Sequence, residues 1–111
     1  MADVENGEVE ITLDGKEETL RCGLKRAKAL NAFAGGNGHH GITARLGMLD
    51  FDTYVQVVAI GLDRKPVDVE ERVYRTGIVN LTADLLTYVT NLANGGKPIK
   101  AAEGDAPEGE D

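Results

Sequence analysis

The chain has 111 residues, of which 41% are hydrophobic, so it holds enough apolar material for the core of one small domain. Its formal net charge is −7, and this acidic balance argues against a nucleic-acid partner, because phosphate contacts need clustered lysine and arginine. A single cysteine cannot form an internal disulfide, which suits a reducing cytoplasm. No apolar run approaches ~18 residues and no leader is visible, so we expect a cytoplasmic protein without membrane contact.

The segment "GEVEITLDGKEETLRC" predicts a β-hairpin over residues 7–22. Its first half alternates apolar and polar side chains, which is the period-2 pattern of a strand with one wet face. Asp14-Gly15 then suits a type I′ turn, because both central residues of that turn need a positive φ. An isolated hairpin is marginal in water, so this one must rest on helices, pair with another chain, or do both.

A two-residue turn sets the register and sorts the hairpin into an apolar and a polar face. The apolar face comprises Val9, Ile11, Leu13 and Leu20. Glu18 falls opposite Ile11 and is the one misfit, so we expect it to lie at an edge. Cys22 continues the apolar face and is interpreted as a small core residue rather than a nucleophile. We expect the hairpin to pack chiefly on the final helix, whose apolar stripe matches it in size.

Helical spacing begins after the hairpin. Residues 24–34 predict a short helix that ends at Gly35-Gly36, since glycine commonly terminates helices. The next residues, "GGNGHHG" (35–41), predict a flexible loop. In "ITARLGML" about two helical turns are expected. They would place Ile42, Leu46 and Leu49 on one side.

Asp50 resembles the N-cap of a helix over residues 51–62, because its carboxylate can accept hydrogen bonds from the free N–H groups of the first turn. Within this segment the run "YVQVVAI" is rich in β-branched residues, and taken alone it also suits a strand. The length of the segment and its cap favour a helix.

Two further helices are expected to meet at Gly77. In "VDVEERVYRTG", Asp68 and Glu71 have the spacing of a capping box. The buried stripe of this helix is expected to comprise Val69, Val73 and Tyr74. After Gly77, residues 78–94 carry an apolar stripe at helical spacing and end at two glycines.

The composition changes at Lys97. Residues 97–111 hold two lysines against five acidic residues and only one large apolar side chain. Such a segment cannot bury enough surface to offset its chain entropy, so we expect a disordered acidic tail. The sequence therefore predicts an α+β fold in which residues 1–96 form one domain, with the hairpin packed on a small bundle of about four helices, and residues 97–111 form the tail.

Deleting residues 97–111 is expected to leave the melting temperature almost unchanged, because a segment of this composition adds nothing to a core. Thermal melts of the full and the shortened chain measure this. A drop of many degrees would show that the tail packs on the domain.

His39-His40 is the strongest candidate for site chemistry, since neighbouring histidines can ligate a metal. A metal centre needs three or four ligands on rigid elements, and neither cysteine nor glutamate stands at a useful spacing. We therefore interpret the pair as solvated loop residues and predict no metal, no cofactor and no enzymatic activity. A metal-dependent enzyme at these two histidines is the competing hypothesis, which bound metal in the purified protein would reveal.

The order of these pieces resembles the tail-assembly chaperone family of siphophages and gene transfer agents. The resemblance covers residues 7–96 and is most specific in the opening "GEVEITLDG" and in "VDVEERVYRTGIVNLTADLLTYVTNLANGG", where two helices meet at Gly77. One departure is "NAFAGGNGHHG", which breaks the first helix earlier than is usual in the family.

The resemblance implies a role in assembling a phage-like tail inside a host bacterial cell. Members of this family are encoded between the major tail protein and the tape measure protein, bind the tape measure, and help recruit tube subunits around it. The implied partners are the tape measure protein and, as a second candidate, the major tail protein; the edge of the hairpin suggests pairing with another copy as well. Met48, Phe51 and Tyr54 are the residues expected to contact a partner. The alternative is a structural subunit of the tail, such as a tube or terminator component.

Overall fold

An antiparallel hairpin opens the part of the chain that the structure, a computed structural model, describes, residues 7–98. Its strands β1 (Val9–Leu13) and β2 (Lys16–Leu20) pair in the predicted register around the two-residue turn at Asp14-Gly15. Both turn residues have positive φ, 53° and 80°, as a type I′ turn requires. Both the predicted hairpin and the α+β fold class are confirmed.

Helices make up most of the remaining described chain. They are α1 (Leu24–Ala34), α2 (Gly38–Gly47), α3 (Phe51–Leu62), α4 (Pro66–Thr76), the short 3₁₀ helix η2 (Ile78–Leu81) and α5 (Thr82–Ala93). Five α-helices thus stand where about four were expected, because the segment around residue 42 forms a full helix rather than two turns.

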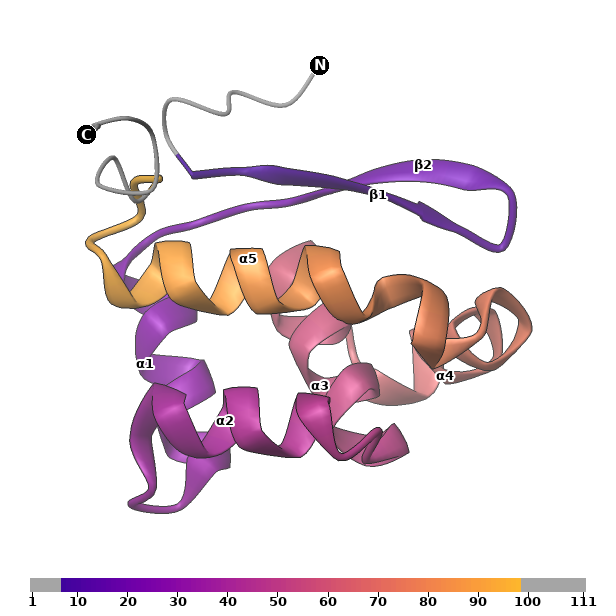
Figure 1. Ribbon diagram of the computed structural model, residues 1–111. Helices are drawn as coiled ribbons and strands as arrows, with labels where there is room; N and C mark the ends of the chain where they lie inside the picture. Colours follow the sequence, from indigo (N-terminus) through magenta and orange to yellow (C-terminus); the bar gives the residue numbers. More distant parts are fainter. Residues whose placement is uncertain (1–6, 99–111) are drawn as a thin grey trace, which may run out of the picture.

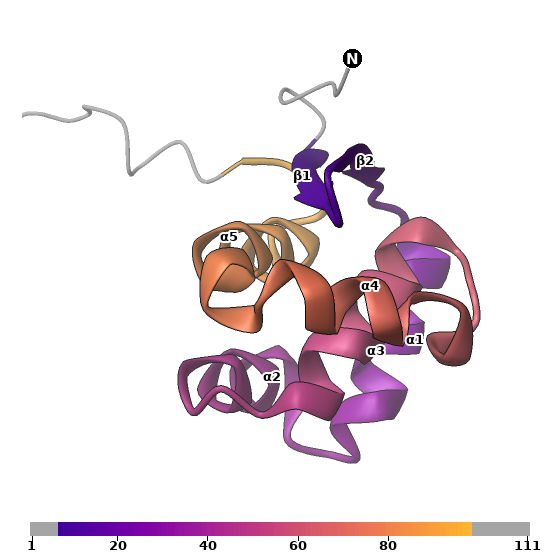
Figure 2. The same ribbon diagram turned by 90° about the vertical axis from the view of Figure 1, so that its right-hand side faces the viewer.

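The hairpin forms a layer on one side of the helices, and α2 lies on the opposite side (Figure 1). Helix α5 runs between these two layers and contacts both β1 and α2. Turning the molecule by 90° shows the hairpin above the space between α5 and the α3–α4 pair (Figure 2). The core therefore lies where α5, α3 and the underside of the hairpin meet.

The apolar face of the hairpin is buried, but it does not rest chiefly on the final helix. Strand β1 contacts α5 and α4, whereas β2 contacts α3. Leu20 is fully buried against Gly61 of α3, where an added Cβ would lie only 2.6 Å from its Cδ2 atom. The absence of a side chain at Gly61 therefore lets strand and helix approach closely, and the N–H of Arg21 donates to the Gly61 carbonyl at 3.0 Å.

The expectation that Glu18 lies at an exposed edge is wrong. Its carboxylate is half-buried and accepts a hydrogen bond from Arg72 of α4 at 2.9 Å, with the guanidinium of Arg64 at 3.7 Å. Arg72 also donates to the carbonyl of Leu13 at 3.2 Å, so one guanidinium holds both strands. Glu18 points inward because these two arginines supply the positive charge that a half-buried carboxylate needs.

The prediction of a flexible loop over residues 35–41 is wrong for residues 38–41, which are helical. Gly35 ends α1 in the left-handed conformation, as predicted, but α2 already begins at Gly38 and contains both histidines. Ile42 and Leu46 are buried as expected. Leu49 is not on their side, because α2 ends at Gly47 and Leu49 adopts a φ of 59° with an exposed side chain.

The start of α3 is confirmed and that of α4 is corrected. The side chain of Asp50 caps α3 by accepting from the N–H of Thr53 at 3.3 Å. Helix α4 begins at Pro66, so Asp68 lies within its first turn and forms no capping box with Glu71. Proline at the first helical position, with its φ already suited to a helix, starts α4 ahead of the acidic residues.

The final helix brings the end of the described chain next to its beginning. A 3₁₀ turn precedes α5, whose predicted stripe is buried. On α5 the amide of Asn91 donates to the carbonyl of Gly7 at 3.1 Å, and its main-chain carbonyl accepts from the N–H of Gly96 at 2.8 Å. The two ends of the described chain therefore lie side by side. The predicted disordered tail falls, from residue 99 onward, outside the described residues.

Candidate interaction surface

One end of the helical assembly is built from four chain segments: the end of α2, the start of α3, the end of α4, and η2. From inside, Tyr54 of α3 links the end of α2 to Thr82, the first residue of α5, which directly follows η2. It is fully buried, its hydroxyl donates to the carbonyl of Leu46 at 2.5 Å, and it lies 2.8 Å from the hydroxyl oxygen of Thr82. Because α3 and α4 follow each other through a short turn and pack together, the start of one lies beside the end of the other.

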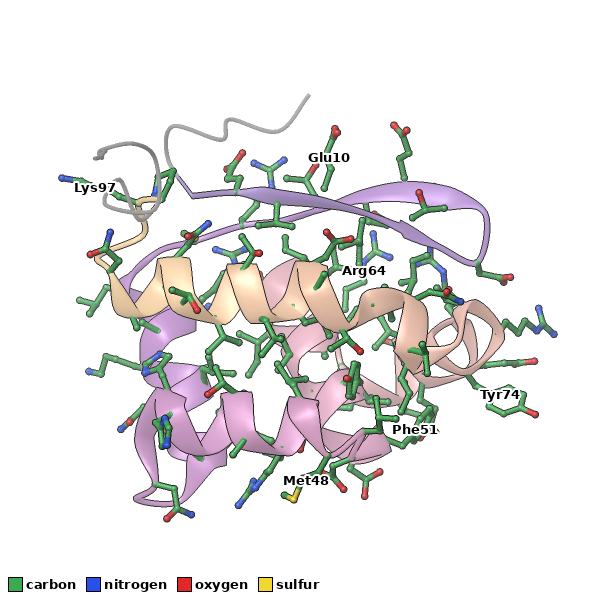
Figure 3. The ribbon with its side chains drawn as sticks, in the orientation of Figure 1. Glu10, Met48, Phe51, Arg64, Tyr74 and Lys97 are labelled. Carbon is green, nitrogen blue, oxygen red and sulfur yellow. The ribbon has the colours of Figure 1, made fainter. Side chains whose placement is uncertain are left out.

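Apolar side chains gather at this end, which we call the apolar end. Its members are Met48, Leu49, Phe51, Tyr74 and Val79. All but Phe51 rank among the exposed large apolar residues, with Met48 at 72% and Tyr74 at 74% exposure, while Phe51 is half-buried against the core. Figure 3 shows Met48 at the bottom of the molecule, with Phe51 to its right and Tyr74 farther right. Large apolar side chains that gather on a protein surface are typical of an interaction site.

The sequence-predicted contact residues occupy different depths at this end. Met48 is exposed and Phe51 forms the half-buried edge between it and the core. Tyr54, the third residue expected to contact a partner, is fully buried, so its side chain does not form part of the exposed surface. Helix α3 is covered on nearly all sides, which a search for one apolar stripe does not reveal.

Three members of the apolar end are not predicted as contact residues by the sequence. Tyr74 is expected in the buried stripe of α4 with Val69 and Val73, yet its side chain is exposed. Leu49 is expected on the side of Ile42 and Leu46, and Val79 lies within the predicted last helix, but both side chains are exposed. Periodicity alone cannot separate a residue at the border of a stripe from one within it, since neighbouring positions differ by about 100° around the helix axis.

The two histidines stand on the first turns of α2 rather than in a loop. His39 is half-buried, and its Nε2 atom is buried without a hydrogen-bond partner in residues 7–98. His40 is exposed. The described residues contain no group of three or more histidine, cysteine or acidic side chains that could hold a metal.

Cys22 follows β2 and is half-buried beside the start of the hairpin. Its thiol donates to the carbonyl of Gly7 at 3.3 Å. Burial raises the pKa of the thiol above its ordinary value, and the negative charge of Glu8 raises it further. Because the thiolate is the reactive form, these surroundings make Cys22 a weak nucleophile.

Cys22 is therefore expected to react with iodoacetamide more slowly in the folded protein than in urea at the same pH. The raised pKa lowers the thiolate fraction, and partial burial restricts access. Mass spectrometry of timed samples measures both rates. Equal rates in the two conditions would contradict the expectation.

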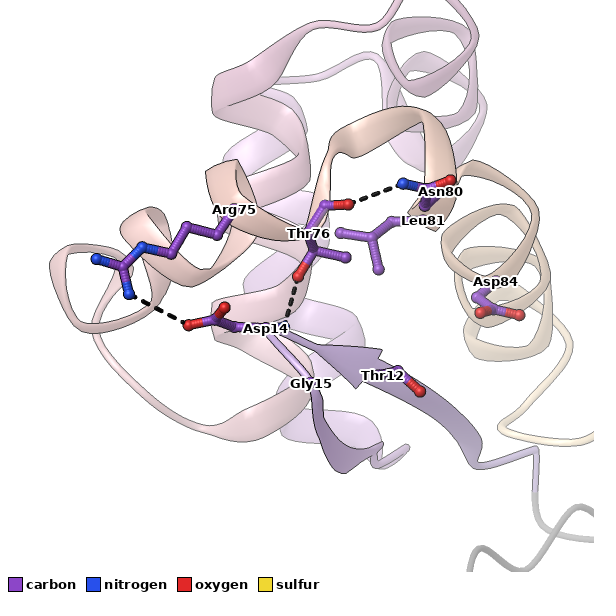
Figure 4. A pocket seen from close by; sticks show the side chains of 8 residues that line it. All are labelled: Thr12, Asp14, Gly15, Arg75, Thr76, Asn80, Leu81 and Asp84. Atoms are coloured by element: carbon purple, nitrogen blue, oxygen red, sulfur yellow. Dashed lines mark hydrogen bonds and ion pairs between the residues drawn. The ribbon is translucent and has the colours of Figure 1, made fainter.

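An open polar groove of about 460 Å³ lies at the other end of the hairpin, where its turn meets α4 and η2 (Figure 4). The N–H of Asp14 donates to the hydroxyl of Thr76 at 2.6 Å, and the carboxylate of Asp14 lies 3.5 Å from the guanidinium of Arg75. Asn80 donates to the carbonyl of Thr76 at 2.8 Å. These groups mainly bond one another, so the groove serves to anchor the turn on α4.

Comparisons of this chain with protein-family models, curated proteins and solved structures found no match. Within residues 7–98, none of the helices has the length and apolar character needed to cross a bilayer.

Proposed function

We propose that this protein is a non-catalytic assembly chaperone for a phage-like tail, which covers an amphipathic helix of the tape measure protein with its apolar end. The observation that carries the proposal is that these five apolar side chains, from four chain segments, are exposed or only half-buried. The resemblance of the sequence to tail-assembly chaperones supplies the identity of the partner.

The chemistry of the apolar end suits a helical partner. Methionine and aromatic residues are enriched in the buried centres of protein interfaces, and Met48, Phe51 and Tyr74 are of these types. An amphipathic helix binds such a surface through apolar residues at helical spacing. A long tape measure exposes an apolar stripe that aggregates until it is covered. The net charge of −7 on this protein would keep the complexes soluble, because like charges repel one another.

Co-expression with the cognate tape measure protein tests the proposal. The tape measure is expected to stay soluble and to co-purify, and the complex is expected to survive high salt, because apolar burial is little affected by screening. A tape measure that remains wholly insoluble, with no complex at any salt concentration, would refute the proposal.

A matched pair of variants locates the surface. The double variant Met48→Glu/Tyr74→Glu is expected to lose co-purification, because it places two charges where apolar contacts form. Leu24→Glu is the control: Leu24 is also exposed, but it lines a cavity with Ala93 and Gly96 at the opposite end of α5. Circular dichroism checks that all three proteins are folded. Equal loss of binding in the control would place the contact elsewhere.

The alternative proposal is a structural subunit of the finished tail. A tube subunit needs several strands for its inner ring, and the described chain offers two. Mass spectrometry of purified particles separates the hypotheses: a chaperone is expected to be absent from them, whereas a subunit would be present in many copies.

A further inference from the structure

The outer face of α4 extends the exposed apolar surface beyond the apolar end. Val67, on the first turn of α4, is 69% exposed, and it lies seven positions before Tyr74, which is 74% exposed. Residues seven positions apart stand on the same face of a helix, about 10 Å from each other along its axis. Helix α4 faces the viewer in Figure 2, and Tyr74 points away from the domain in Figure 3. Apolar surface therefore continues from the apolar end along α4.

Two carboxylates stand beside these apolar side chains. Glu70 lies on the turn of α4 between Val67 and Tyr74, and Asp52 follows Phe51 on the first turn of α3. Both acidic side chains are exposed, and within residues 7–98 neither makes an ion pair. Each can therefore accept charge-assisted hydrogen bonds from the cations of a partner.

The cations of the same segments are engaged or offset. The guanidinium of Arg75 lies 2.6 Å from the carboxylate of Glu71. Arg45, near the end of α2, stacks on an aromatic ring of α1 at 5.7 Å. Lys65 immediately precedes α4, and the exposed Asp68 in the first turn of that helix offsets its charge. The charge that remains available beside the exposed apolar residues is therefore negative.

We propose that this surface binds a basic amphipathic helix, whose apolar stripe covers the exposed apolar residues while its lysine or arginine side chains pair with Asp52 and Glu70. The unpaired carboxylates carry this inference, because a carboxylate beside a docked apolar stripe loses part of its water, and a cation compensates for that loss. Charge complementarity of this kind selects among partners more than it adds affinity. The inference rests on the proposed function and narrows its partner to helices of the tape measure protein with positive charge beside the apolar stripe.

Three designed helical peptides test the inference on the full chain without the tape measure protein. The peptides share one apolar stripe, and the positions that flank it are all lysine, all glutamine or all glutamate. In fluorescence anisotropy at low salt, the lysine peptide is expected to bind about three- to tenfold more tightly than the glutamine peptide, because exposed ion pairs add little free energy. The glutamate peptide is expected to bind most weakly, and high salt to reduce these differences. Equal affinities, or binding by none of the peptides, would overturn the inference.

Charge variants locate the pairs. Asp52→Asn/Glu70→Gln is expected to lower the affinity for the lysine peptide to about that for the glutamine peptide, which itself stays unchanged. Glu10→Gln/Glu17→Gln is the matched control: it removes the same charge from two exposed residues of the hairpin, and Figure 3 shows Glu10 on the side of the domain opposite Met48. Circular dichroism checks that both variants are folded. Equal loss of selectivity in the control would assign the attraction to the net charge of the protein and would overturn the inference.

An uncharged variant tests the apolar part of the surface. Met48→Gln/Tyr74→Gln is expected to lose binding of the lysine peptide, because the carboxylates alone hold a helix too weakly. Undiminished binding by this variant would overturn the inference.

The inference and the proposed function fail in different ways. A tape measure protein that co-purifies, together with peptides whose flanking charge makes no difference, would uphold the chaperone and overturn the basic helix. Lysine-selective binding without any tape measure complex would uphold the basic helix and refute the chaperone.

Discussion

Replacing Tyr54 by alanine is expected to lower the free energy of unfolding by about 3–5 kcal/mol, as for other large aromatic residues removed from a core. Tyr54 has no exposed surface, and its ring fills the space between α2, α3 and α5. Urea titration followed by circular dichroism measures the loss. A change near zero would mean that the ring lies outside the core and would return Tyr54 to the partner surface.

One further variant measures the contribution of the Tyr54 hydroxyl alone, and another serves as an exposed control. Tyr54→Phe removes only the hydroxyl and leaves the Leu46 carbonyl without that donor, so a loss of about 1–2 kcal/mol is expected. Tyr74→Ala is the matched control, because Tyr74 is 74% exposed, and it is expected to change stability by less than about 0.5 kcal/mol. If the apolar end binds the tape measure, Tyr74→Ala weakens that binding while the fold persists.

The second large effect is expected at the hairpin. Leu20→Ala should lower the free energy of unfolding by about 2–4 kcal/mol, because a fully buried leucine leaves a cavity when it is shortened. Leu20 packs directly against Gly61, where strand β2 and helix α3 are already in close contact. The two backbones therefore cannot easily move closer to fill the cavity that the shorter side chain leaves. Urea titration again measures the change.

Leu24→Ala provides the control for the hairpin prediction. Leu24 has the same side chain but is 77% exposed, so its shortening is expected to change stability by less than about 0.5 kcal/mol. Similar losses in the two variants would show that the underside of the hairpin is no better packed than the surface.

The buried contacts of Tyr54 also explain how the domain holds its apolar end in place. The hydroxyl of Tyr54 donates to the carbonyl of Leu46 near the end of α2 and lies beside Thr82 of α5. Met48 follows Leu46 by two residues, so this hydrogen bond holds the segment that carries Met48. A surface held in place before binding loses less conformational entropy when a partner docks. The core residue and the exposed residues therefore have separate roles that the two sets of measurements distinguish.

Local signals in the sequence were sufficient for the hairpin and for most helix ends. Alternation of side chains and the Asp14-Gly15 pair determine the register of β1 and β2 within a few residues of each other. The cap at Asp50 and the stop at Gly35 act on the adjacent turn of helix. Two helix starts were misplaced: Pro66 started α4 ahead of Asp68, and α2 began at Gly38 within the predicted loop.

Burial of individual side chains depended on segments that are distant in sequence. Glu18 turns inward because Arg72, 54 positions later, supplies its counter-charge, and nothing near Glu18 in the sequence indicates this. Tyr54 is buried because Leu46 and Thr82 converge on its hydroxyl. The sequence by itself therefore determined which elements form and how the strands pair, since those depend on neighbouring residues. Only the tertiary structure decided which faces are covered, and so where the apolar end lies, because packing between remote elements sets the surroundings of each side chain.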